Sequence, residues 1–146
     1  MLVFVGALAV SFAPPAWPAS QQPSDGFSLM NAQRAIDAGV ALARSRGMHT
    51  AFVVLMPDGE PVIAAEVTGT SAQARNAATG RAACLAANFP GRGQTSLGKG
   101  HGQRCIVRGA EVVRWAEKPV AIFAVAGAGE VKDEQILEAM LGAARP

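Results

Sequence analysis

A tight turn between two β-prone runs is the feature that most constrains the fold of this chain. The runs are Ala51–Met56 and Pro61–Val67, and Pro57-Asp58-Gly59 lies between them. Proline followed by aspartate and glycine favours a reversal of the backbone. Two strands joined by so short a connection must pair antiparallel, because a parallel pair needs a crossover of a dozen or more residues. The sequence therefore predicts a β-hairpin.

Three helices are expected around this hairpin. The first starts after Ser28, whose hydroxyl can cap it, and ends at Gly47, with Asn31 on its polar side. Its apolar residues recur at helical spacing: Leu29, Ala32, Ile36, Val40 and Ala43. An alanine-rich helix is expected over Ser71–Asn88, and a third over Val131–Ala143.

The remaining β-prone segments complete the sheet. They are Arg104–Arg108, Glu111–Trp115 and Pro119–Ala126. The order helix, two strands, helix, strands, helix predicts an α/β protein of the α+β type. In this fold an antiparallel sheet of about five strands carries helices packed on it, which excludes a doubly wound nucleotide fold. A length of 146 residues supports one such domain.

The N-terminal segment is typical of an export signal. Leu2–Ala13 is an apolar run too short to span a bilayer, which needs about 20 residues, and the breaker-rich Pro14–Ala19 follows it. We expect cleavage near Ala16 or Ala19, a periplasmic or secreted protein, and no stable membrane span after cleavage. The predicted organisation is a signal peptide (1–19), a linker (20–27) and the folded domain (28–146).

Basic residues are concentrated in the middle of the chain. The formal net charge of +2 is too small to indicate a nucleic-acid partner. Between Arg75 and Lys118, however, eight basic residues face only Glu111 and Glu117. Such a region can attract carboxylate or phosphate groups, although ordinary solvated surface is the alternative for each residue taken singly.

Two cysteines, Cys84 and Cys105, are the whole thiol content of the chain. Their spacing fits no zinc site, which needs four ligands in close pairs. In an oxidising compartment they can form one disulfide. The alternative is two buried thiols that act as small hydrophobic groups.

No motif in the sequence indicates a catalytic site. Gly93–Gly100 resembles the start of a phosphate-binding loop, but Gly100 replaces the Ser or Thr that would hold magnesium. Nucleophilic catalysis finds no support in the sequence, and no nucleophile elbow is present. Whether the protein is an enzyme is therefore left open.

Three stretches together resemble the GlcG/HbpS-like (haem-degrading, DUF336-type) family. They are Leu29–Ile36, Ala78-Thr79-Gly80-Arg81-Ala82 and Val120–Leu141. The chain departs from the family pattern at Met56, where an aspartate is usual, and over Gln103–Ile106. The resemblance implies a profilin-like/GlcG-like fold, a homo-oligomer, and binding of haem or another tetrapyrrole.

The candidate ligand residues lie mostly in the glycine-rich basic loop. His101 is flanked by Lys99 and Arg104, so its imidazole can ligate haem iron while the cations pair with propionates. A solvated loop histidine is the alternative. His49, just past the first helix, is a weaker candidate for the iron. Arg81 matches the basic position of the family's second helix, where it can bind a carboxylate or pair with Asp133 or Glu134.

The leading hypothesis is thus an exported protein that binds haem, another tetrapyrrole or a small anionic ligand, for scavenging, sensing or delivery. One alternative is an enzyme that degrades haem or acts on a small carboxylate. Another is an assembly subunit with no ligand of its own, whose alanine-rich helices form its interface.

Overall fold

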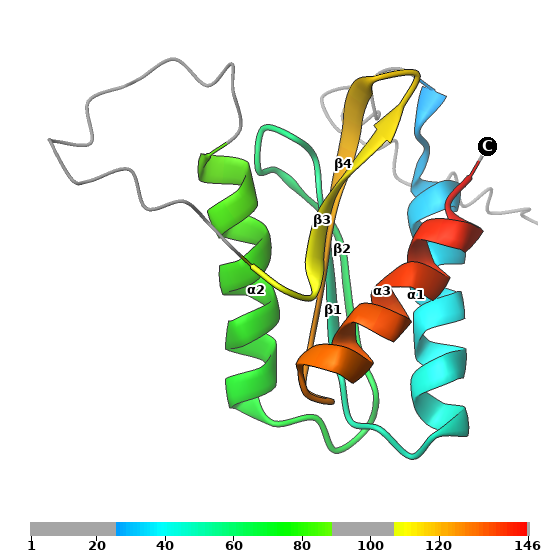
Figure 1. The fold of residues 1–146 in the computed structure, drawn as a ribbon, viewed down its shortest axis with the longest axis vertical. Coiled ribbons are helices and arrows are strands. Elements are labelled where there is room, and N and C mark those ends of the chain that lie inside the picture. Colours follow the sequence, from blue (N-terminus) through cyan, green and yellow to red (C-terminus); the bar gives the residue numbers. More distant parts are fainter. Residues whose placement is uncertain (1–25, 89–106, 146) are drawn as a thin grey trace, which may run out of the picture.

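The computed structural model describes residues 26–88 and 107–145. Within them lie three helices and one four-stranded sheet, shown in Figure 1. In chain order the elements are α1 (Leu29–Ser45), β1 (Ala51–Leu55), β2 (Pro61–Glu66), α2 (Ala72–Ala87), β3 (Ala110–Trp115), β4 (Lys118–Ala126) and α3 (Glu130–Ala143). The α+β class and the hairpin are confirmed.

The predicted strand Arg104–Arg108 accounts for the difference between four strands and the expected five. Residues 104–106 lie outside the described residues, whereas Val107 and Arg108 precede β3 and do not belong to a strand. The sheet has the order β2-β1-β4-β3, and every neighbouring pair is antiparallel.

The molecule has three layers, with the sheet in the middle. Figure 1 shows α2 on one face of the sheet and α1 with α3 on the other. The central strands are buried on both faces, and this explains why β1 and most of β4 are continuous apolar runs without alternation. In the described part of the chain, no helix is both long and apolar enough to cross a membrane.

The hairpin turn forms as the sequence predicts. Met56 and Gly59 are joined by a backbone hydrogen bond of 2.8 Å from the Gly59 N–H to the Met56 carbonyl. Gly59 has a φ of +92°, which a residue with a side chain rarely adopts. The Asp58 carboxylate accepts from the N–H of Glu60 at 3.0 Å and closes the turn.

The start of α1 differs from the prediction in one residue. Ser28 caps the helix as expected, but Asn31 is buried and does not lie on a polar surface. Its side-chain oxygen accepts from the Ser28 N–H at 2.9 Å, which makes a capping box. Its amide nitrogen lies 3.4 Å from the carbonyl of Ala144, so the cap also joins α1 to the end of α3.

Small side chains bring α2 close to the sheet. Its buried residues are four alanines at intervals of four: Ala74, Ala78, Ala82 and Ala86. Ala78, Ala82 and Ala86 pack in one cluster with residues of β1 and β4, which include Ala51 and Ala124. The larger core side chains lie on the other face, between the sheet and the helices α1 and α3, and include Phe52, Phe123 and Met140.

Candidate functional site

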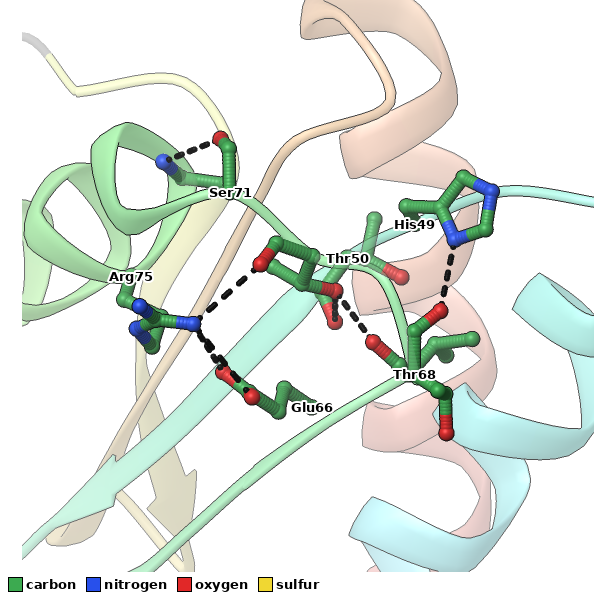
Figure 2. Close-up of polar contacts among 9 residues, drawn as sticks. His49, Thr50, Glu66, Thr68, Ser71 and Arg75 are labelled. Atoms are coloured by element: carbon green, nitrogen blue, oxygen red, sulfur yellow. Dashed lines mark hydrogen bonds and ion pairs between the residues drawn. The ribbon is translucent and has the colours of Figure 1, made fainter.

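The loop Val67–Ser71, which joins β2 to α2, organises the polar groups at one end of the sheet (Figure 2). The buried Thr70 hydroxyl lies 2.6 Å from the Val67 carbonyl and 3.1 Å from the Thr50 carbonyl, and it can donate its proton to either. The Val67 N–H also donates to the Thr50 carbonyl, at 2.9 Å. These contacts fix the loop to the start of β1.

His49 lies on one side of this loop. Its Nδ1 is 2.8 Å from the carbonyl oxygen of Thr68, and the side chain is exposed to solvent. A carbonyl oxygen only accepts, so Nδ1 must carry the proton. In the neutral imidazole, Nε2 then holds an unshared electron pair. A hydrogen bond from the other ring nitrogen to a backbone carbonyl, like the one from Nδ1 here, is the usual way in which a protein orients a histidine as a metal ligand.

Arg75 and Glu66 lie on the other side of the loop. Arg75 Nη1 is 3.1 Å from Glu66 Oε2 and 3.2 Å from the Thr70 carbonyl, and Figure 2 shows that this one nitrogen makes every contact drawn for Arg75. The two side chains border a surface groove of about 250 Å³ between α2 and the β1–β2 hairpin. Ala51, Val53 and Ala64 are among its apolar lining residues.

Arg81 makes one of the two structural ion pairs that were predicted for it. Its Nη1 lies 2.9 Å from Asp133 Oδ2 and also donates to the Val125 carbonyl. Asp133 is almost wholly buried, and its second oxygen accepts from the Ala128 N–H at 2.9 Å. Arg81 thus links α2 to α3, and its predicted role as a ligand-binding residue stays a prediction.

The structure describes three of the predicted site residues: His49, Arg81 and Cys84. Lys99, His101, Arg104 and Cys105 lie outside the described residues. Cys84 on α2 is disulfide-bonded, while its pairing with Cys105 stays a prediction. Among residues 26–88 and 107–145, no three His, Cys, Asp or Glu side chains are placed to hold a metal ion.

Two features of this end of the sheet were missed by the sequence analysis. Arg75 and Glu66 were not predicted to meet, although Glu66 ends β2 and Arg75 lies in the first turn of α2. The contact between His49 and Thr68 has no sequence signal, because it depends on where the backbone carbonyl of an exposed loop points.

Comparison with known proteins supports the fold. No protein-family model matches the sequence, and no curated protein is significantly similar to it. Solved structures do match. A double mutant of HbpS from Streptomyces reticuli has a TM-score of 0.60 at 21% identity, covering 92% of this chain and 97% of that chain. The DUF336 protein ORFY from Klebsiella pneumoniae has a TM-score of 0.65 at 16% identity, with the same coverage.

A third similar structure is described as a complex of PduOC with haem. Its TM-score is 0.65 at 15% identity, and the match covers 80% of this chain and 93% of that chain. The resemblance to GlcG/HbpS-like proteins that the sequence predicted is therefore confirmed at the level of the fold.

Proposed function

We propose that this chain, which has the fold of the GlcG/HbpS-like proteins, is an exported protein that binds haem or another tetrapyrrole. The fold supports the proposal because one similar structure is a haem complex. A shared fold does not by itself carry a function. The proposal therefore depends on what this chain's own residues offer to iron.

The observation that carries the proposal is the hydrogen bond between His49 and Thr68. With Nδ1 held as a donor to the Thr68 carbonyl at 2.8 Å, the exposed Nε2 is the acceptor nitrogen of the ring. A neutral imidazole in this tautomer is the protein ligand that haem iron most often receives. His49 thus fits haem by its donor chemistry, and we assign it the iron contact. The iron, when bound, supplies the ligand-binding and redox chemistry of the cofactor.

The groove beside Arg75 does not fit a tetrapyrrole. Its volume of about 250 Å³ is below the roughly 300–1,000 Å³ of pockets that enclose a drug-sized ligand, and His49 is not among its described lining residues. We therefore place haem at His49 and not in the groove. The basic residues Lys99 and Arg104, with His101 as a second imidazole, are proposed to complete the site.

Export and assembly complete the proposal. A disulfide at Cys84 supports an oxidising compartment, because structural disulfides are rare where thiols are kept reduced. We propose that residues 1–19 are removed as a signal peptide and that the mature chain forms a homo-oligomer. The intact mass of protein recovered from the periplasm tests the cleavage, and light scattering after size exclusion tests the assembly.

A hemin titration tests the binding function. The chain contains two histidines, His49 and His101, so one double variant, His49→Ala with His101→Ala, removes every imidazole. We expect the purified wild-type protein to shift the Soret band of hemin at a fixed stoichiometry, and the double variant to lose that shift. No Soret shift with the wild-type protein, or an identical one with the double variant, contradicts the proposal.

A further inference from the structure

The groove between α2 and β2 exists because the helix does not cover the whole sheet. The main contacts of α2 are with β4, β1 and β3, so the edge strand β2 extends past it. On the face of the sheet that carries α2, Ala64 and Glu66 of β2 are exposed. The floor of the groove includes Ala51 and Val53, whose short side chains leave the space unfilled.

Arg75 borders this groove with a guanidinium that is held at one nitrogen only. Nη1 contacts Glu66 and the Thr70 carbonyl, which fixes the plane of the group. Within the described part of the chain, no protein acceptor lies at Nε or Nη2 of Arg75. These two nitrogens form the edge of an arginine that binds a carboxylate through two parallel hydrogen bonds. Because the group is already oriented, little side-chain freedom is lost on binding.

We propose that the groove binds a small monocarboxylic acid with a short apolar body. The carboxylate pairs with the Nε–Nη2 edge of Arg75, and the body lies over Ala51, Val53 and Ala64. Thr79, one helical turn after Arg75, also lines the groove and places a hydroxyl beside the guest. This site is distinct from His49, so the inference goes beyond the haem proposal and does not depend on it.

The composition of the groove selects this class of ligand over others. Its lining is mostly apolar, and the lining residues with polar side chains are Arg75, Glu66 and Thr79. A polyanion such as a phosphate ester would meet the negative charge of Glu66, which already occupies one side of the guanidinium. A single carboxylate at the opposite edge avoids that repulsion, and an apolar body removes the alanine and valine surface from water.

Butyrate is the probe that tests this site, with its uncharged isostere butyramide as the ligand control. Amide chemical shifts of the purified protein, followed by NMR during the titration, report where the ligand lies. We expect saturable shifts at Ala51, Val53, Ala64 and Thr79 with butyrate, and binding at least about tenfold weaker with butyramide, because charge-assisted hydrogen bonds are lost. Equal binding of both, or shifts spread over other surfaces, overturns the inference.

Three variants sharpen the test. Arg75→Gln should weaken butyrate binding at least about tenfold, whereas Arg34→Gln, an exposed arginine of α1 on the other face of the sheet, should leave it unchanged. Ala64→Leu fills the groove from an exposed position and should abolish the shifts without changing the fold.

Wild-type affinity for butyrate in both Arg75→Gln and Ala64→Leu overturns the proposal. Hemin binding is measured on the same variants and should be unaffected, so failure here is separable from failure of the haem proposal.

Discussion

Asp133 of α3 accepts a hydrogen bond of 2.9 Å from Nη1 of Arg81 on α2, although these helices lie on opposite faces of the sheet. The carboxylate is 1% exposed and the arginine side chain 22%. Arg81 also reaches the Val125 carbonyl, close to Gly109, where a Cβ would lie 2.7 Å from Nη1. One buried ion pair thus joins the two helical layers at the end of β4.

Removal of Arg81 should therefore destabilise the fold. In Arg81→Leu the Asp133 carboxylate stays buried with no cation beside it, so we expect the free energy of unfolding to fall by about 3 kcal/mol, the lower end of the range for a broken buried pair, since Arg81 is partly exposed. Urea unfolding measures this loss. Arg34→Leu, at an exposed arginine of α1, should change stability by less than about 0.5 kcal/mol. A loss below about 1 kcal/mol in Arg81→Leu would contradict the structural role.

The β3–β4 turn stores backbone strain that substitution should relieve. Ala116 and Glu117 both have positive φ, of 48° and 66°, in a two-residue connection between Trp115 and Lys118. Such turns favour Asn-Gly, because residues with a Cβ are unfavourable by about 1–2 kcal/mol in this region. The variant Ala116→Asn with Glu117→Gly should raise the free energy of unfolding by about 1 kcal/mol. Thermal unfolding measures this gain, and an unchanged circular dichroism spectrum of the folded variant shows that the fold is kept. A lowered melting temperature would contradict the geometry.

Two helical glycines should respond to alanine in opposite directions. A Cβ at Gly39 of α1 would lie 2.8 Å from a ring carbon of Phe52 and 2.9 Å from Met140, both fully buried. At Gly142 of α3 it would meet no atom within 4 Å. Overpacking in Gly39→Ala should lower the free energy of unfolding by about 1–3 kcal/mol, less the gain in helix propensity. Gly142→Ala should raise the free energy of unfolding by about 0.5–1 kcal/mol, because only the gain in helix propensity applies there. Chemical denaturation of the two variants compares them, and equal effects would show that α1 and α3 do not pack as described.

The disulfide of Cys84 should contribute to stability. If it joins Cys105, it closes a loop of about 20 residues. Closing such a loop lowers the entropy of the unfolded chain and raises the free energy of unfolding by about 3 kcal/mol. We expect a reductant to lower the melting temperature of the wild-type protein but not that of a Cys84→Ser, Cys105→Ser variant. Alkylation of the oxidised, denatured protein followed by mass spectrometry provides the direct check, and two modified thiols would rule out the bond.

The fold was predictable where short-range chemistry determines it. Pro57-Asp58-Gly59 specifies a turn that only an antiparallel hairpin can use, and Ser28 marks the start of α1 because its hydroxyl accepts from the backbone of the first turn. Asn31 was assigned to a polar surface because its position on the helix was considered without the end of α3, whose Ala144 carbonyl lies against it. Tertiary contact, which a sequence pattern does not contain, buried it.

The site was predictable only in part. Arg81 was expected to pair with an acid at the start of the last helix, since the resemblance placed both residues, and Asp133 is its partner. His49 was ranked below His101 because glycines around a histidine indicate exposure, whereas the feature that prepares His49 for a metal is a hydrogen bond to the Thr68 backbone. The groove at Arg75 depends on α2 stopping short of β2, a packing result that no local pattern encodes.

Electron paramagnetic resonance of the ferric complex tests the iron contact of His49, because the spectrum of ferric haem reports the nitrogen ligand of the iron. We expect the wild-type complex to show imidazole ligation, His49→Ala to change that signature because His101 is then the one imidazole left in the chain, and Arg75→Gln, a variant of the separate groove, to retain it. An imidazole signature that persists unchanged in His49→Ala would contradict the assignment of the iron to Nε2 of His49.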